Sequence, residues 1–177
     1  LEIIEACHLY HMPARDVVVV VHPQSIVHSL VELADGAMMG HFAVPDMRVP
    51  IAGCLSWPYL SDGRITGIQR LDLAKLGTLT FEAPDRETFP LLELAFKALA
   101  AGGGETIVLN AANEIAVEAF LDRRIGFTTM FALVADMLAK IDAPKPESVE
   151  AILDLDRKTR ALTREAVAVL ERNGKEG

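Results

Sequence analysis

The sequence of 177 residues is short of cysteine, of positive charge and of long apolar runs. Two cysteines, Cys7 and Cys54, are too few for a disulfide scaffold and form no CxxC motif, so we expect two buried thiols in a reducing cytoplasm, or in a plastid if the source is eukaryotic. The formal net charge of -8 argues against nucleic-acid binding, which needs basic patches to neutralise phosphates. No apolar run approaches the roughly 18 residues of a membrane span, so no membrane association is expected.

Histidine is absent from the last three quarters of the chain, since all five histidines lie within the first 41 residues. Any imidazole chemistry is therefore expected near the start. A zinc site is not indicated, because Cys7, His8 and His11 lack a second ligand pair at a zinc-finger distance. We expect His28 and His41 to face each other or neighbouring side chains across a hairpin, either as hydrogen-bonded structural residues or as functional groups.

The chain opens on LEIIEA, which has the pattern of a helix interior and no capping residue before it. Glu2, Glu5 and His8 follow one another at intervals of three, so they share one stripe of this helix. Such a stripe is either a solvated helix face or half of a metal or acid/base site. The other half would then lie upstream, which leads us to expect that the chain is only part of an enzyme.

The segment after this helix has the pattern of a small sheet. Residues 17–22, which begin with an apolar run of valines at 17–21, have the pattern of a buried strand. Residues 26–33 and 37–44 predict a hairpin, with the turn signal Asp-Gly at residues 35 and 36. The predicted fold class is therefore α/β at the start: a partial layer of one helix and about three strands.

A linker and a helical bundle are predicted for the rest of the chain. Residues 51–57 predict a short helix, and the segment 58–77 is rich in Pro, Gly and Asp with little periodicity. We place the end of an α/β catalytic and dimerisation domain at residues 1–56, an extended linker at 57–82 and an all-α bundle at 83–177.

Four to five helices with short loops are predicted in the bundle. Thr88 is expected to cap the first helix, residues 102–104 (Gly-Gly-Gly) to end it, and Asn110 to cap a second helix over 111–121. A third helix is predicted from residue 128 or 129 to about 141, followed by a short helix at 148–153 and a long one at 156–172. The apolar stripe expected on the last helix comprises Leu155, Thr159, Leu162, Ala166, Val169 and Leu170.

Two further motifs have a chemical and a structural interpretation. Asp46 and Arg48 flank Met47 in a loop, where they either line a pocket for an anionic substrate or pair with each other in an ordinary turn. The glycines at 102–104 are not a phosphate-binding loop, because they lack a following Lys-Ser/Thr and come after a helix.

Several exact strings carry a resemblance to a known family. They include HPQSIVHS at residues 22–29, PDMRVPIA at 45–52, LDLAKLGTLTFEAPD at 71–85 and LNAANEIAVEAFL at 109–121. Together with LEIIEA at the start, in this order and spacing, the chain resembles the C-terminal part of 1-deoxy-D-xylulose 5-phosphate reductoisomerases. The resemblance extends to about Arg172.

The resemblance implies an activity, cofactors and an assembly. Members of the family convert 1-deoxy-D-xylulose 5-phosphate into 2-C-methyl-D-erythritol 4-phosphate in the non-mevalonate route to isoprenoids. They rearrange the carbon skeleton and reduce the product with NADPH, while Mg²⁺ or Mn²⁺ chelates the substrate oxygens. The resemblance also implies a homodimer, with an N-terminal domain that binds most of the NADPH and is missing here.

The resemblance assigns roles to few residues of this chain. Glu2 matches a catalytic metal ligand, whereas Glu5 matches a second acid of the same helix that is not assigned to the metal. His28, Pro45 and Met47 match positions near the bound substrate. Because the other metal ligands and the phosphate-binding residues would lie upstream, we expect the chain alone to be inactive. The alternatives are a dimerisation or structural module, or a stand-alone helical binding protein.

Overall fold

The computed structural model describes residues 1–59 and 67–174. They divide into two compact units, one made of Leu1–Val18 with Asp85–Gly177 and the other of Val19–Pro84. A two-stranded sheet lies in the second unit and a helical bundle in the first, which confirms the predicted fold class. No helix within the described ranges is both long and apolar enough to span a membrane.

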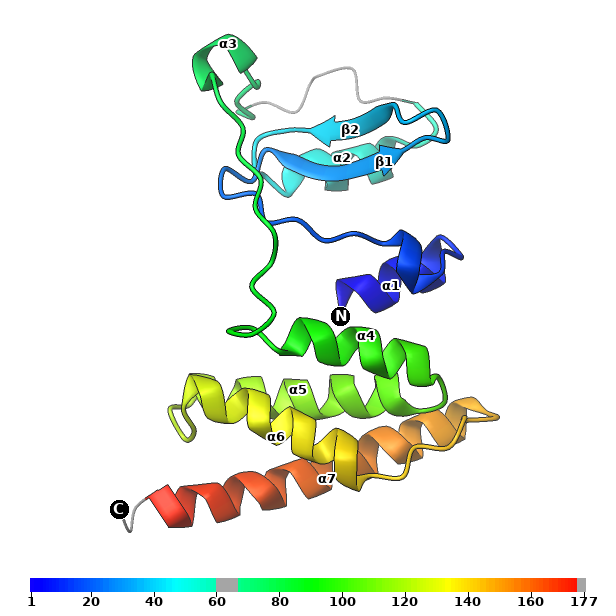
Figure 1. The fold of residues 1–177 in the computed structure, drawn as a ribbon, viewed down its shortest axis with the longest axis vertical. Coiled ribbons are helices and arrows are strands. Elements are labelled where there is room, and N and C mark those ends of the chain that lie inside the picture. Colours follow the sequence, from blue (N-terminus) through cyan, green and yellow to red (C-terminus); the bar gives the residue numbers. More distant parts are fainter. Residues whose placement is uncertain (60–66, 175–177) are drawn as a thin grey trace. The chain divides into compact units, whose positions relative to one another are not determined.

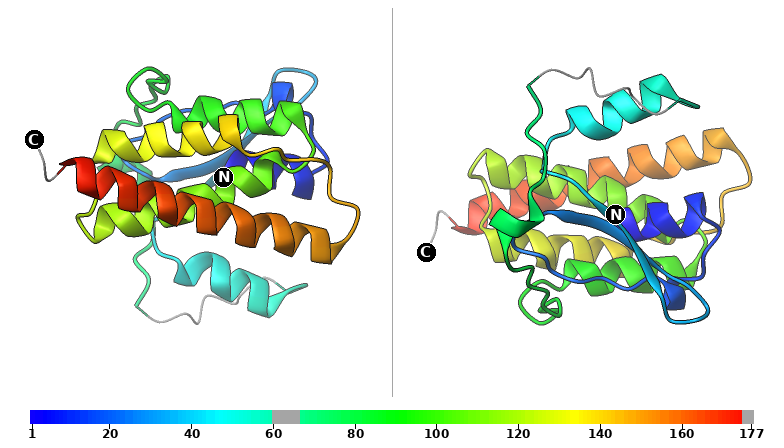
Figure 2. Two further views of the ribbon diagram at one scale, coloured as in Figure 1. Left: turned by 90° about the horizontal axis from the view of Figure 1, so that it is seen from below. Right: turned by 90° about the horizontal axis from the view of Figure 1, so that it is seen from above.

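Helix α5 is the centre of the bundle in the first unit (Figure 1). It runs over Glu105–Leu121 and packs against α4 (Leu91–Ala101), α6 (Phe127–Lys140) and α7 (Val149–Gly174). Helices α6 and α7 also lie side by side (Figure 2). The buried face of α5 is rich in small residues, which let the neighbouring helices approach closely: Ala111, Ala112, Ala116 and Ala119.

The glycine triplet ends α4 as predicted, but the next helix begins earlier than expected. Gly102 and Gly103 have φ of 72° and 59°, a conformation that glycine adopts without strain. Helix α5 then begins at Glu105, so Asn110 lies inside it and donates from Nδ2 to Glu114 Oε1 at 3.0 Å. The expected Asn110 cap is wrong. The helix begins on the N-terminal side of Asn110, at Glu105, because Val108 and Leu109 are buried and belong to the helix.

The start of α4 is also organised differently from the prediction. Thr88 does not cap it; instead, the Asp85 side chain accepts the backbone N–H groups of Glu87 and Thr88 at 3.1 and 3.0 Å. The residue before the helix is Pro90, which makes no side-chain cap. An aspartate turn followed by proline therefore begins α4, and the predicted threonine cap is wrong.

The last two predicted helices are one continuous helix, α7. Its buried stripe includes Thr159, Thr163 and Val167, all fully inaccessible to solvent. Leu162 and Val169, which we expected to face inward, are 37% and 45% exposed. The rest of the predicted stripe is confirmed, because Thr159 is buried and Leu155, Ala166 and Leu170 pack against the core.

Helix α1 (Glu2–Leu9) packs on α4 within the first unit. Leu1 precedes its first turn and makes no side-chain cap. Ile3, Ile4 and Cys7 are buried, and Ile4 contacts the core of the bundle. A short 3-10 helix, η1 (Ala14–Asp16), follows and also contacts α4.

The second unit contains the predicted hairpin. Strands β1 (Val27–Glu32) and β2 (Met38–Phe42) are antiparallel, and their turn is fixed by the Asp35 side chain, which accepts the Ala37 N–H at 2.9 Å. The predicted strand at residues 17–22 is wrong. These residues form only an isolated bridge between Val21 and Glu82, and Val18 is 82% exposed, because within the described ranges no neighbouring strand pairs with them.

Among the described residues of the second unit, two helices accompany the hairpin. Helix α2 (Arg48–Ser56) begins three residues before the predicted start, and α3 (Leu73–Leu76) is a single turn capped by the Asp72 side chain. Part of the predicted linker, residues 60–66, lies outside the described residues. Cys54 in α2 is exposed, so the expectation of two buried thiols holds only for Cys7.

Candidate functional site

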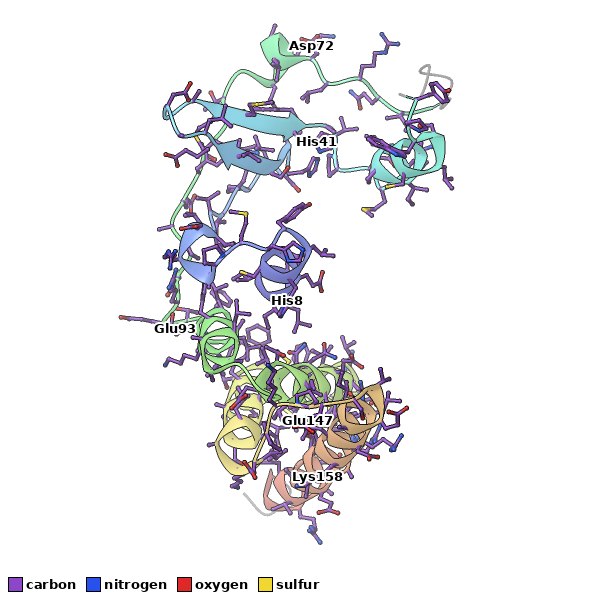
Figure 3. The ribbon with its side chains drawn as sticks, turned by 90° about the vertical axis from the view of Figure 1, so that its right-hand side faces the viewer. His8, His41, Asp72, Glu93, Glu147 and Lys158 are labelled. Atoms are coloured by element: carbon purple, nitrogen blue, oxygen red, sulfur yellow. The ribbon has the colours of Figure 1, made fainter. Side chains whose placement is uncertain are left out.

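The acidic stripe of α1 is exposed at the N-terminal end of the helix. Glu2 and Glu5 lie in the first turn, where the positive end of the helix dipole favours carboxylates, and His8 lies in the last turn (Figure 3). All three side chains are exposed. The stripe is therefore accessible to solvent and to ligands.

A hard cation fits the chemistry of Glu2, because carboxylate oxygens are the ligands that Mg²⁺ prefers. Over residues 1–59 and 67–174, however, no group of three or more His, Cys, Asp or Glu side chains is arranged to hold a metal ion. Mg²⁺ takes further oxygen ligands besides one carboxylate, so the described residues form no complete site.

The other three residues assigned by sequence lie in the second unit. His28 belongs to β1, and Pro45 and Met47 belong to the connection between β2 and α2. All three are exposed, and Met47 has 71% of its surface accessible. The structure therefore distributes the four candidate residues over two units, with Glu2 in the first and the rest in the second.

Asp46 and Arg48 pair with each other. Arg48 Nε donates to Asp46 Oδ1 at 3.0 Å and Nη2 donates to Oδ2 at 2.5 Å, while the Arg48 backbone N–H donates to Oδ1 at 2.9 Å. The hydrogen bond from the Arg48 side chain is the main reason why the pKa of Asp46 is lowered. The local-turn interpretation is confirmed, and the guanidinium is already neutralised by its neighbour.

The His28 and His41 rings face each other across the hairpin, as expected. Their centres are 5.6 Å apart and the ring planes are tilted by 45°. His28 Nε2 lies 3.1 Å from the carbonyl oxygen of Ala43, and His41 extends from β2 (Figure 3). Both side chains are exposed, so two imidazoles meet on an accessible face.

Sequence reasoning missed the role of the HPQS segment, which binds Thr80 and Phe81. His22 Nδ1 donates to the Thr80 carbonyl at 2.7 Å, and the His22 ring stacks on Phe81 with centres 4.6 Å apart. Gln24 bonds both the backbone N–H and the hydroxyl of Thr80. The hydrogen-bonded partners are 56 and 58 residues apart, so no local pattern could have indicated this contact.

Two shallow features occur on the bundle. An open hollow of about 440 Å³ follows the exposed side of α5 and is lined partly by Asn113, Glu114 and Glu118. Glu114 is engaged there, because Arg160 of α7 bonds both Glu114 and Asp156 at 2.8 and 2.7 Å. A smaller groove of about 260 Å³ is lined by Leu1, Leu91, Leu92, Ala95, Leu109 and Asn113.

Comparison with known families and sequences gives one consistent result. Residues 42–162 match the family described as the DXP reductoisomerase C-terminal domain. The chain is 52% identical over 168 residues to a 1-deoxy-D-xylulose 5-phosphate reductoisomerase of Pelodictyon phaeoclathratiforme, and 53% identical over 167 residues to that of Chlorobium limicola. These alignments cover 95% and 94% of this chain but only 43% of each relative.

Solved structures agree with the sequence comparison. The reductoisomerase of Zymomonas mobilis in complex with NADPH is 41% identical and superimposes with a TM-score of 0.87 over 94% of this chain. A DOX-P reductoisomerase in complex with NADPH, fosmidomycin and magnesium gives a TM-score of 0.86 at 40% identity over 96% of this chain. In both cases the match covers 43% of the solved chain.

Proposed function

Since the chain belongs to the DXP reductoisomerase family, we propose that it forms part of a cytoplasmic enzyme that converts 1-deoxy-D-xylulose 5-phosphate into 2-C-methyl-D-erythritol 4-phosphate. The identity of 52% across 95% of the chain is the observation that carries this proposal. The chain spans 43% of the length of that relative, and we propose that the remaining machinery lies outside these residues.

NADPH and a divalent cation are the proposed cofactors. The similar solved proteins bind NADPH and magnesium, which supports Mg²⁺ or Mn²⁺ here. When bound, the cation polarises substrate oxygens as a Lewis acid. Glu2 supplies one carboxylate to it, consistent with its exposed position in the first turn of α1. NADPH is held mainly by residues beyond this chain.

His28, Pro45 and Met47 are proposed to border the phosphorylated sugar substrate. Their exposure in the second unit supports this role, because a binding residue must remain accessible in the absence of ligand. We also propose the division at residues 1–56, 57–82 and 83–177 into the end of a catalytic domain, a linker and a helical domain. Glu5, the second acidic residue of α1, is proposed not to bind the metal.

The experiment that tests the function uses both the longer protein and the chain alone. The longer protein should oxidise NADPH only when 1-deoxy-D-xylulose 5-phosphate and Mg²⁺ are both present. The 177-residue chain should give background rates under the same conditions, because one carboxylate does not hold the cation. Turnover by the chain alone would contradict the prediction that the chain is inactive. Absence of turnover by the folded longer protein would contradict the proposed reductoisomerase activity.

An assembly role is the second candidate, and the exposed hairpin favours it. A two-stranded sheet leaves strand edges unpaired. Five apolar side chains of β1 and β2 are between 39% and 64% exposed: Leu30, Val31, Met38, Met39 and Phe42. We therefore propose a homodimer. Sedimentation of the longer protein and of the chain should reveal a dimer, and a monomer at all concentrations would remove this role.

A further inference from the structure

The His28–His41 pair has the arrangement of a small metal site, and no role in the proposed function requires both rings. In the hairpin, Val27 pairs with Phe42 but Ser29 pairs with His41, so β1 has one extra residue at His28. Such a bulge re-aims the side chain of the extra residue. It brings the His28 ring to the face of the sheet where the His41 ring lies.

The hydrogen bond to Ala43 fixes the tautomer of His28. A carbonyl oxygen only accepts, so the His28 Nε2 atom that lies 3.1 Å from Ala43 O carries the proton. In the neutral form of such a ring, the Nδ1 atom has a free lone pair. Histidines that bind metals almost always donate their other ring N–H to a carbonyl, a carboxylate or water, and His28 already makes such a bond.

The separation of the rings suits a shared ion. Two imidazoles bound to one tetrahedral Zn²⁺, with Zn–N bonds of about 2.0 Å, hold their ring centres roughly 5 Å apart. The observed separation of 5.6 Å is close enough for a small side-chain rotation to close it. Both rings are exposed, so such a rotation meets little resistance from packing.

We propose that His28 and His41 form a two-histidine site for a borderline divalent transition metal, represented by Zn²⁺. Imidazole nitrogen suits Zn²⁺, Ni²⁺ and Cu²⁺, whereas Mg²⁺ takes oxygen ligands. The site is therefore chemically distinct from the carboxylate chemistry of Glu2. Water completes the coordination, since no third His, Cys, Asp or Glu joins the pair within the described ranges.

The test is calorimetric titration of the 177-residue chain with ZnCl₂ in a buffer that does not chelate metals, together with NMR of the histidine ring signals. Wild type should bind one Zn²⁺ at this site, and the signals of His28 and His41 should shift together. His41→Gln should weaken this binding at least tenfold, because changes in groups that merely orient a ligand already cost about 10–100-fold. MgCl₂ should leave both signals unchanged.

A double variant, His8→Gln with His11→Gln, is the matched control. It removes two other exposed histidines but leaves the hairpin intact, so its Zn²⁺ affinity at the pair should equal that of wild type. Thermal unfolding of His41→Gln verifies that the exposed substitution preserves the fold. The proposal is overturned if His41→Gln binds Zn²⁺ as wild type does, or if only the His8 and His11 signals respond.

Discussion

Gln24 holds Thr80 with both ends of its side-chain amide. Gln24 Oε1 accepts the Thr80 backbone N–H at 3.2 Å, and Gln24 Nε2 donates to the Thr80 hydroxyl at 2.8 Å. The bridge between Val21 and Glu82 and the stacking of His22 on Phe81 lie beside this contact. The HPQS segment therefore fixes the path of residues 80–82, which precede the helical part of the chain.

Replacing Gln24 by alanine should free this segment. Each lost hydrogen bond removes about 0.5–1.5 kcal/mol, toward the lower end here because the bonds are exposed. Hydrogen exchange at the Thr80 and Glu82 amides should accelerate, while that of the bundle stays the same. Gln69→Ala, at an exposed glutamine of the same unit, is the control and should change nothing. Unchanged exchange at Thr80 in Gln24→Ala would refute the proposed contact.

The two buried threonines of α7 should respond in opposite ways to replacement by valine. Thr159 Oγ1 is buried and has no hydrogen-bond partner among the described residues, whereas Thr163 Oγ1 donates to the Thr159 carbonyl at 2.7 Å. Thr159→Val removes an unsatisfied hydroxyl and should stabilise the bundle by about 1 kcal/mol. Thr163→Val removes a hydroxyl that makes a hydrogen bond, so it should not stabilise the bundle. Urea unfolding of both variants measures the difference, and equal effects would contradict the assignment.

The turn that begins α2 should weaken in acid. The Arg48 side chain lowers the pKa of Asp46 in the folded chain relative to its ordinary value of 3.8. A lowered folded pKa gives a contribution to stability that is complete above pH 3.8 and is lost as the pH falls through the folded pKa. In NMR spectra of the folded chain, the chemical shift of the Arg48 Nε–H should therefore change only below pH 3.8, as the pH falls through the lowered pKa of Asp46.

Asp46→Asn is the matched control for this titration. The amide oxygen can still accept the Arg48 backbone N–H, but the side chain no longer ionises. The acid-dependent change at Arg48 should disappear in this variant. If it persists unchanged, another carboxyl group causes it and the Asp46–Arg48 pair is not responsible.

Local patterns predicted those parts of the fold that depend on near neighbours in sequence. The hairpin follows from the Asp-Gly turn. The C-terminal end of α4 follows from the glycines after it, and the extent of α6 follows from helical periodicity. Patterns failed where a tertiary partner decides the outcome. Residues 17–22 pair with the described part of the chain only through the bridge of Val21 to Glu82, and Asn110 lies inside α5 because the residues around it are buried.

The candidate site could be predicted only in part, for a similar reason. The pairing of Asp46 with Arg48 and of His28 with His41 follows from closeness along a turn or across a hairpin. The contact of Gln24 with Thr80 joins residues 56 positions apart and has no local signal. The role proposed for Glu2 rests on the resemblance alone, because their spacing does not distinguish Glu2 from Glu5.

Glu2 and Glu5 can be separated by the same substitution at each position. Both are exposed in the first turn of α1, so replacement by glutamine should leave the fold intact. In the longer protein, Glu2→Gln should remove several kcal/mol of transition-state stabilisation and so lower kcat, because a metal ligand loses its charge. It should also weaken activation by Mg²⁺. Glu5→Gln should have a much smaller effect on both. Measured Mg²⁺ dependence of NADPH oxidation decides between them, and equal losses would mean that the two carboxylates act together rather than Glu2 alone.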